Sequence, residues 1–341
     1  MVELPRDPRS IHVGDEPPTP VREPLSPAPS ARRRRWAWLC LATVTLVVTP
    51  TLGFGLVAWS AWTRVDRVDV SSALEGGAVA NYLVVGTDSR AGVPAEVENA
   101  EVIFGEGITG ERTDSIAVVR VENGTVSLLA VPRDLYLPID GHGRNRINAA
   151  FAFGGPELLI RTVQRELGIP VHHYLEVDFA GFLGLVDALG GVTINFAHPT
   201  YDARSGLAIE TAGSHRLDGA AALAFVRSRR FTELIEGEMI TDPTSDLGRV
   251  RRQQEFLAAV MSQLGATRNP FTLLGALQAV ADNVRVDDGF GIGRAISLGW
   301  TMRGAEPRTA TVPADRFITE SGADVLVLNA DSEAVLAAFR R

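Results

Sequence analysis

The chain of 341 residues contains no lysine, so all 33 of its basic residues are arginine. This absence excludes phosphate-binding loops that depend on a lysine, and enzymes that form a Schiff base on one. Arginine stays protonated at ordinary pH, so it can position and neutralise negative charge but cannot act as a general base. Any proton transfer must therefore come from another residue type.

Cysteine is almost absent as well, because Cys40 is the only one and lies in the most apolar stretch. One cysteine cannot form a disulfide or a thiolate zinc site within the chain. None of the six histidines has the spacing of a metal site. With 45% hydrophobic and 22% charged residues, the chain can bury one large core or two modest ones, and packing must hold it together.

Large apolar residues are scarce in residues 1–35, which hold eight of the 19 prolines. This composition is typical of a disordered, solvated tail. The tail ends in four consecutive arginines, and no charged residue follows until Arg64. At about 1.5 Å per residue, a helix over 36–63 is longer than the roughly 30 Å hydrocarbon core of a bilayer. The sequence predicts one transmembrane helix at 36–63.

The flanks of this span predict its orientation. Trp36 and Trp38 at one end, and Trp59 and Trp62 at the other, match the aromatic belts of a membrane. Four arginines against one nearby arginine favour a cytoplasmic N-terminus, with everything from residue 64 outside the cytoplasmic membrane. A cleaved signal peptide is the alternative, but the run is too long for one and lacks a small-residue cleavage site. The net charge of −8 argues against a nucleic-acid partner.

Beyond the span, apolar segments alternate between strand-like and helix-like patterns. Asn123-Gly124 between two apolar runs is a strong hairpin signal. Helices are expected over 156–168, 179–190, 219–227, 247–264, 271–282 and 291–302. Two acidic stretches, 92–111 and 231–246, are expected as long loops, the second partly covering a pocket. The fold expected for 64–341 is a three-layer α-β-α sandwich with a mixed central sheet, having its core at 79–266 and further helices and strands at 267–341.

Arginine and aspartate recur in short clusters at the edges of apolar runs. The clusters are VVGTDSR (84–90), RTDS (112–115), VPRD (131–134), RIN (146–148), FVRSRR (225–230) and DLGRVRRQQ (246–254). Guanidinium groups bind phosphate oxygens with paired donors, and nearby carboxylates suit a hard divalent ion that also bonds phosphate. The clusters therefore predict a site for a polyphosphate, and a diphosphate in particular.

The predicted elements bring these clusters to one region. Asp88 and Arg90 follow a strand and Asp114 precedes another, and loops at strand ends gather ligands in α/β sheets. Each aspartate could instead cap a turn.

The later arginines fit the same pocket. Arg227 and Arg229 point the same way if the chain is extended there. Arg249, Arg252 and Gln253 lie three and four residues apart and share a helix face. An ordinary solvated arginine face, or pairing with acids of the preceding loop, is the alternative for these residues.

In this order, the segments NYLVVGTDSR, RTDSIAVVRV, VPRDLYLPI, RINAAFAFGG, VDFAGFLGLVDALGGV, LDGAAALAFVRSRR and DLGRVRRQQ closely resemble the LytR-CpsA-Psr family of cell-envelope proteins. The resemblance runs from about residue 79 to 266, and more loosely to the C-terminus. It implies a membrane-anchored enzyme that moves a glycopolymer from a polyprenyl diphosphate carrier onto peptidoglycan and leaves a phosphodiester link.

The resemblance also implies residue roles. Asp88 and Asp114 match the family's ligands for Mg²⁺, a role that Mn²⁺ could also take. The residues that match the family's diphosphate-contacting arginines are Arg112, Arg133, Arg227, Arg229 and Arg249, and Gln253 matches a polar partner nearby. Together with Arg90, Arg146 and Arg252, which lie in the same clusters, they make up the expected diphosphate-binding set. Arg146 stands where lysine is frequent, and Phe151 stands where tyrosine is frequent, which removes a hydroxyl. Asp134 is a possible base, or an anchor for Arg133.

Two other functions remain open from the sequence. A metal-dependent phosphatase could hydrolyse the polyprenyl diphosphate with the same residues if water replaced the sugar hydroxyl. A non-catalytic membrane protein could bind carrier lipids or regulate envelope genes, although the N-terminal tail contains no folded DNA-binding unit.

Overall fold

The computed structural model describes residues 51–77, 80–87, 113–244, 246–302, 305 and 307–340. The chain divides into two units, Met1–Phe54 and Gly55–Arg341, and the second carries the fold described below. A helix occupies 51–62, the last part of the predicted span, whereas the predicted tail and residues 36–50 lie outside the described residues. Within the part described, no helix is both long and apolar enough to cross a membrane.

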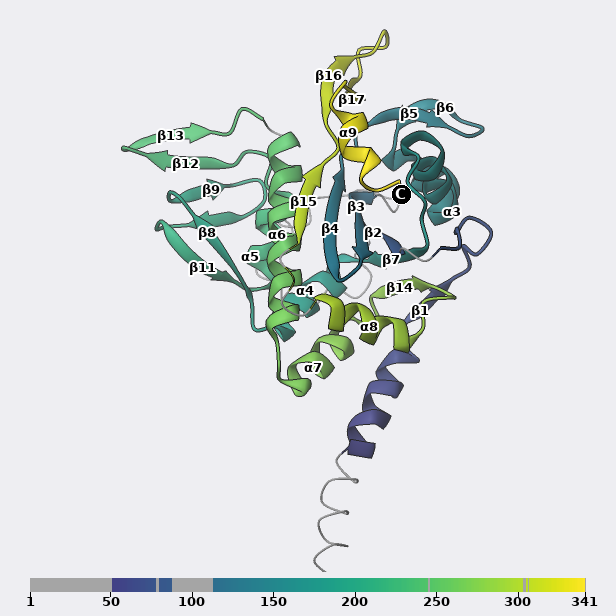
Figure 1. Ribbon diagram of the computed structural model, residues 1–341. Coiled ribbons are helices and arrows are strands. Elements are labelled where there is room, and N and C mark those ends of the chain that lie inside the picture. Colours follow the sequence, from purple (N-terminus) through teal and green to yellow (C-terminus); the bar gives the residue numbers. More distant parts are fainter. Residues whose placement is uncertain are drawn as a thin grey trace, which may run out of the picture. The chain divides into compact units, whose positions relative to one another are not determined.

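The centre of the fold is a seven-stranded sheet (Figure 1). Its strands, in spatial order, are β1 (Asp66–Val68), β14 (Val284–Asp287), β7 (His173–Val177), β2 (Ala80–Thr87), β3 (Thr113–Glu122), β4 (Thr125–Val131) and β15 (Arg308–Thr311). β2 runs parallel to β7 and antiparallel to β3. The predicted mixed α/β sheet is confirmed.

The predicted hairpin joins β3 to β4. Asn123 and Gly124 have φ angles of 49° and 77°, the left-handed pair that the tight hairpin turn requires. The two strands pair in register from Ile116 opposite Val131 to Glu122 opposite Thr125. This turn chemistry explains why the hairpin could be read from two residues.

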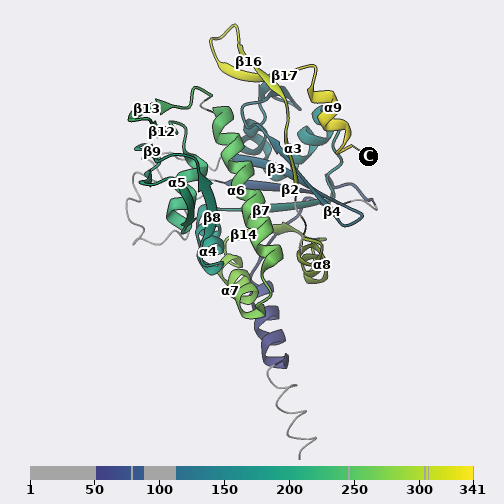
Figure 2. The ribbon, with the colours of Figure 1, turned by 60° about the vertical axis from the view of Figure 1, so that its left-hand side comes forward.

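Helices cover both faces of the sheet (Figures 1 and 2). They are α3 (Asn148–Leu167) and α9 (Ser332–Ala337) on one face, with α6 (Asp246–Ala266), α7 (Pro270–Val280) and α8 (Ile292–Met302) on the other. Alternate strand residues face opposite ways: Leu83 and Val85 of β2 pack in the core below α3, whereas Tyr82 packs in the core shared with α6, α7 and α8. This alternation produces the expected three layers.

Glycine and proline set the ends of α3. Gly155 has a φ of 65° and interrupts the helix, which resumes at Pro156; proline suits the first turn because it lacks an N–H that would be unbonded there. Gly168 ends the helix in the left-handed conformation, with a φ of 68°. The predicted helix from 156 to 168 is therefore correct.

A second hydrophobic cluster lies beside α6. It contains α4 (Phe179–Ala188) and α5 (Gly219–Arg227), with Asp178 and Asp218 as their N-caps, as predicted. Short strands complete this part: β8 (Val192–Phe196) with β11 (Gly213–Leu217), and β9 (Thr200–Asp202), β10 (Leu207–Ile209), β12 (Thr232–Ile235) and β13 (Glu238–Thr241) in one small sheet.

Two hairpins lie near the remaining edge of the fold. They are β5 (Tyr136–Ile139) with β6 (Gly143–Arg146), and β16 (Ala314–Ile318) with β17 (Asp324–Leu328). The backbone N–H of Leu326 in β17 donates to the carbonyl oxygen of Asp134 at 3.0 Å. This bond places the C-terminal hairpin beside the VPRD cluster.

Candidate functional site

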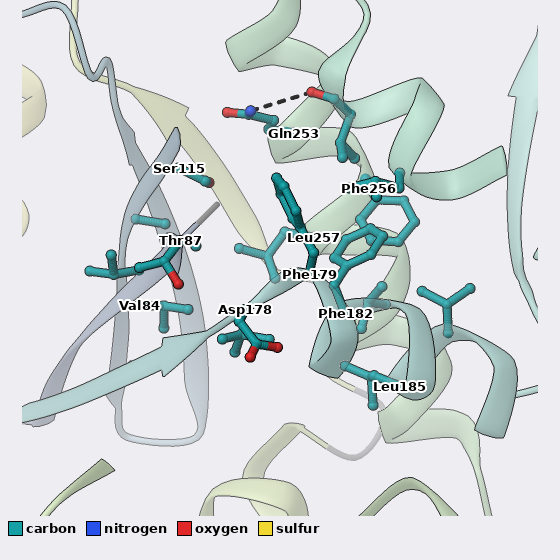
Figure 3. Close-up of a pocket in the computed structure, with 18 of the residues that line it drawn as sticks. Val84, Thr87, Ser115, Asp178, Phe179, Phe182, Leu185, Gln253, Phe256 and Leu257 are labelled. Carbon is teal, nitrogen blue, oxygen red and sulfur yellow. Dashed lines mark hydrogen bonds between the residues drawn. The ribbon is translucent and has the colours of Figure 1, made fainter. Parts of the chain in front are cut away.

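An apolar cavity of about 170 Å³ lies between the main sheet and the second cluster (Figure 3). Its walls come from β2, β3, α4, α5 and α6. The apolar residues lining it are Val84, Val85, Ala117, Val177, Phe179, Phe182, Leu185, Val186, Leu223, Val226, Phe256, Leu257 and Val260. A cavity with this lining favours an apolar ligand, such as a hydrocarbon chain.

Five polar side chains also line this cavity: Thr87, Ser115, Asp178, Arg227 and Gln253. The guanidinium carbon of Arg227 lies 5.1 Å from the centre of the Phe179 ring, within range of a cation–π interaction. The amide of Gln253 donates to the carbonyl oxygen of Val226 at 3.3 Å. In Figure 3, Thr87 and Ser115 lie on the side opposite Phe182 and Phe256, and Asp178 lies at the start of α4, the helix that carries Phe182. The cavity therefore combines an apolar wall with a charged and hydroxyl-bearing one.

Two buried hydroxyls mark the end of the β2–β3 pair. Thr87 pairs with Thr113, with an irregularity in register just before it. Both side chains are buried, and the Oγ1 atom of each has no hydrogen-bond partner among the residues that the structure describes. Buried hydroxyls are normally bonded, so oxygens at this position suit a ligand or an ion.

A second pocket, of about 290 Å³, adjoins the first and is rich in arginine. Its lining comprises Arg133, Asp134, Arg146, Arg229, Pro243, Thr244, Arg316, Asp324, Val325 and Leu326. Arg229 of the second pocket follows Arg227 of the first by two residues in the chain. Gln253 of the first pocket stands one helical turn from Arg249, which lies 4.0 Å from Asp134 of the second. The two cavities are therefore neighbours. A charged compartment thus lies beside an apolar one.

Asp134 is the centre of the arginine pocket. Its Oδ2 atom lies 3.4 Å from Nε of Arg133 and 4.0 Å from Nη2 of Arg249, and its Oδ1 atom lies 3.4 Å from Nε of Arg146. One carboxylate therefore lies within ion-pair distance of three guanidinium groups. Arg146 also donates to the carbonyl oxygen of Asp324 at 2.9 Å.

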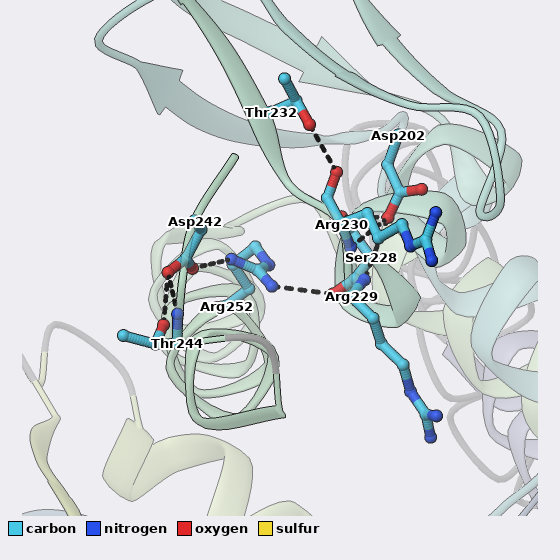
Figure 4. Close-up of polar contacts among 8 residues, drawn as sticks. All are labelled: Asp202, Ser228, Arg229, Arg230, Thr232, Asp242, Thr244 and Arg252. Carbon is cyan, nitrogen blue, oxygen red and sulfur yellow. Dashed lines mark hydrogen bonds and ion pairs between the residues drawn. The ribbon is translucent and has the colours of Figure 1, made fainter. Parts of the chain in front are cut away.

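A buried aspartate fixes the chain that carries Arg229 (Figure 4). Oδ2 of Asp202 accepts from the hydroxyl of Ser228 at 2.7 Å and from the N–H groups of Arg229 and Arg230 at 3.0 and 2.9 Å. Burial alone would raise the pKa of Asp202, but the hydrogen bonds from Ser228, Arg230, Arg204 and Arg229 outweigh it and lower the pKa. The carboxylate thus stays ionised and sets the direction of the arginine segment.

Arg252 lines neither pocket, although the sequence groups it with Arg249 and Gln253 as diphosphate-binding. Its Nη1 lies 3.1 Å from Asp242, and its Nη2 donates to the carbonyl oxygen of Ser228 at 2.7 Å (Figure 4). Its guanidinium carbon also lies 4.6 Å from the centre of the Phe231 ring. Burial lowers the pKa of Arg252, although the hydrogen bond that it donates to Asp242 acts in the opposite direction. This geometry supports a bracing role for Arg252 between α6 and the arginine segment.

From the sequence we expect a single pocket that contains all the clusters. The structure instead brings six of the predicted residues to two adjoining pockets. Arg227 and Gln253 line the apolar cavity, and Arg133, Asp134, Arg146 and Arg229 line the arginine pocket. Arg249 is buried and reaches the second pocket through Asp134. Asp88, Arg90 and Arg112 lie outside the described residues, as does the side chain of Asp114, whose backbone belongs to β3.

Comparison with known proteins identifies the family. The LytR_cpsA_psr family profile matches residues 60–333. The chain belongs to the LytR-CpsA-Psr family. It is 35% identical over 310 residues to the probable cell wall biosynthesis protein LcpB of Corynebacterium glutamicum, covering 88% of this chain and 71% of LcpB. It is 34% identical over 180 residues to the polyisoprenyl-teichoic acid–peptidoglycan teichoic acid transferase TagU of Bacillus cereus, covering 52% of this chain and 55% of TagU.

Solved structures agree with this assignment. The LytR-Csp2A-Psr enzyme from Actinomyces oris superposes with a TM-score of 0.65 at 27% identity, covering 81% of this chain and 96% of that one. The family predicted from the sequence motifs is therefore confirmed.

This LytR-CpsA-Psr protein has site residues that the sequence motifs did not reveal. Arg316 and Asp324, from the β16–β17 hairpin, line the arginine pocket and bond to each other at 2.8 Å. The bond from Arg316 lowers the pKa of Asp324. Phe151 packs in the core below α3, where its missing hydroxyl removes no contact from either cavity.

Proposed function

We propose that this LytR-CpsA-Psr protein transfers a glycopolymer from a polyprenyl diphosphate carrier onto peptidoglycan, with a phosphodiester as the new link. The observation that carries the proposal is the apolar cavity beside an arginine-lined pocket. A polyprenyl diphosphate has the same two parts: a hydrocarbon tail suits the first compartment, and two phosphoryl groups suit the second. The relative TagU is named for a transfer of this kind.

In the proposed reaction, a hydroxyl oxygen of peptidoglycan attacks the phosphorus that carries the glycan. The new P–O bond forms as the bond to the bridging oxygen breaks, and polyprenyl phosphate leaves with the electron pair. The proton of the attacking hydroxyl passes to solvent or to a general base. Cleavage of the diphosphate drives the transfer, so ATP is not required.

The arginines carry the electrostatic part of the reaction. Arg227, at the wall of the apolar cavity, and Arg229, in the adjoining pocket, are placed to neutralise charge on the two phosphoryl groups. Arg133 and Arg146, both held by Asp134, face the same pocket from another strand pair. Fixed cations of this kind stabilise charge that develops on a leaving phosphate.

A divalent ion, Mg²⁺ or Mn²⁺, fits the residues at the end of β2 and β3. Asp88 follows Thr87 directly, Asp114 follows Thr113, and those two threonines pair across the strands with buried, unbonded hydroxyls among the described residues. Carboxylate and hydroxyl oxygens are the donors that hard divalent ions prefer. Bound there, the ion would neutralise phosphate charge, while the arginines orient the substrate.

We also infer that residues 36–63 anchor the chain in the cytoplasmic membrane, with the N-terminus inside and the LytR-CpsA-Psr unit outside. Support comes from the uncharged run and its flanking arginines. Anchoring raises the effective concentration of a catalytic unit around a lipid-borne substrate.

The test uses the full chain in proteoliposomes with a labelled polyprenyl diphosphate glycan, muropeptide acceptor and Mg²⁺. Label on the acceptor, joined through a phosphodiester, is the expected product, and a chelator should abolish it. Release of glycan phosphate and polyprenyl phosphate without transfer to the acceptor would show a phosphatase that hydrolyses the diphosphate instead. Tight lipid binding with neither product would leave a carrier-lipid-binding protein.

A further inference from the structure

Two C-terminal helices carry more apolar surface than they bury. On α8, Ile296 and Trp300 are 64% and 70% exposed, and their spacing of four residues puts them on one face. None of the α8 residues is buried. On α7, Phe271 is 72% exposed and Ala276 is the one buried residue. Large exposed apolar side chains that cluster in this way mark an interaction surface.

The start of the folded unit contributes to the same surface. Leu56 and Trp59 are 69% and 57% exposed, whereas Ala61 and Trp62 pack in the hydrophobic cluster that α7 and α8 also join. Arg64 bonds to Asp282, just beyond α7, at 2.9 Å. The apolar side chains of residues 55–59, α7 and α8 therefore belong to neighbouring elements of the same unit.

We propose that α7, α8 and residues 55–59 form a membrane-docking face that rests in the headgroup region of a lipid bilayer. In the sequence, residue 55 is preceded by an uncharged run that begins at Trp36, and a run of this composition is suited to hydrocarbon. The aromatic residues Trp59, Phe271 and Trp300 are of the type enriched at membrane interfaces.

Charge favours a bilayer over a second copy of the chain. Neither α7 nor α8 contains an acidic residue, and α8 carries Arg294, although the whole chain has a net charge of −8. A face without acids next to aromatic residues suits an interface with anionic lipids.

Docking here would connect the bilayer with the apolar cavity. α7 packs on α4, and α8 packs on α6; α4 and α6 also wall the cavity, through Phe182 and Leu257 for example. A lipid tail would thus travel along helices that already lie at the membrane. This inference rests on the proposed anchoring of the chain, and it adds which face of the unit meets the lipid.

The experiment uses the full chain with Cys40→Ser, reconstituted in phosphatidylcholine–phosphatidylglycerol vesicles. A nitroxide is attached at Ile296→Cys, at Phe271→Cys or, as a matched exposed control on the β16–β17 hairpin, at Phe317→Cys. Power-saturation spectra compare collisions with oxygen, which concentrates in lipid, and with a water-soluble nickel chelate. Labels at 296 and 271 are expected to meet oxygen preferentially, and the label at 317 the chelate.

Equal access of the chelate to positions 296 and 317 would overturn the proposal. Spin–spin broadening at position 296 that vanishes on dilution with unlabelled protein would also overturn it, because such broadening would show that a second copy of the chain covers this face. A second variant, Ile296→Glu/Trp300→Glu, should keep its melting temperature because both side chains are exposed. It should lose on the order of tenfold in rate with bilayer-embedded carrier and nothing with a short, water-soluble carrier analogue.

These outcomes separate the docking face from the transfer reaction. Labels at 296 and 271 that meet oxygen preferentially, on a protein that transfers no glycan, would refute only the proposed reaction. Normal transfer by a protein whose labels at 296 and 271 meet the water-soluble chelate would refute only the docking face.

Discussion

Arg227 and Arg229 are separated by one residue, yet they line different cavities. α5 ends at Arg227, and the fully buried Ser228 bonds to Asp202. The chain therefore turns between the two arginines, with one guanidinium left at the apolar cavity and the other in the arginine pocket. This local bend lets one short motif supply a guanidinium group to each of the two cavities.

Replacing either arginine should impair transfer without unfolding the protein. Arg227→Ala and Arg229→Ala are each expected to lower turnover on the order of 100-fold, the cost of removing one group that stabilises transition-state charge. Arg230→Ala is the control, because Arg230 is exposed and lines neither cavity. Initial rates of label transfer measure the effect, and unchanged rates in both variants would refute the assignment.

Asp202 should make stability depend on acid pH. Its pKa in the fold lies below the ordinary 3.8, so its contribution is fully present above that value and is lost as the pH falls through the lowered pKa. The amide nitrogen of Asp202→Asn cannot accept a hydrogen bond, so the variant's free energy of unfolding should be about 1–3 kcal/mol lower than that of the wild type at neutral pH. Urea unfolding at a series of pH values should show the gap between variant and wild type narrowing below about pH 5. A constant gap would exclude this origin.

Asp134 should act by positioning arginines rather than by accepting the reacting proton. Its two oxygens lie within 4.0 Å of guanidinium nitrogens of Arg133, Arg146 and Arg249, so its contacts are with the arginines that it would position. Asp134→Asn should lower turnover while the acidic limb of the pH–rate profile keeps its midpoint. Loss of that limb in the variant would identify Asp134 as the base.

Much of the fold follows from local signals in the sequence. The Asn123-Gly124 turn, the caps at Asp178 and Asp218, and the glycine end of α3 each have a mechanism that acts within a few residues. The clusters VPRD, RIN and FVRSRR also predicted four of the ten residues that line the arginine pocket, including three of its four arginines, since motifs of charge at the edges of apolar runs are visible without knowing the topology.

Long-range pairings could not be predicted in the same way. Arg316 and Asp324 reach the pocket because Leu326 bonds to the backbone of Asp134, almost two hundred positions earlier in the chain. The division into two cavities depends on the Asp202–Ser228 contact, which no spacing rule reveals.

The stretch 231–246 was expected to be a long loop but contains the β12–β13 hairpin. Glu236 and Gly237 form its turn, with φ angles of 52° and 90°. Neither strand alternates apolar and polar residues, since their sequences are TELI and EMIT, so the periodicity that normally indicates a strand is missing here. Pro243 and Thr244, which follow the hairpin, line the arginine pocket, so the expectation that this segment partly covers a pocket fits the geometry.

Narrowing the apolar cavity should discriminate between carriers of different length. Val84 lines the cavity and is partly exposed, so the larger ring of Val84→Phe would fill space that the tail needs. Displacing roughly two methylene-sized groups, at about 0.8 kcal/mol each, corresponds to about tenfold weaker binding. Val121→Phe is the matched control, since Val121 is a similarly half-buried valine of the neighbouring strand that does not line the cavity. The steady-state KM of Val84→Phe should rise with a long-chain carrier and stay at the wild-type value with a two-isoprene carrier. An equal rise of KM for both carriers, or for both variants, would show that the lipid tail binds elsewhere.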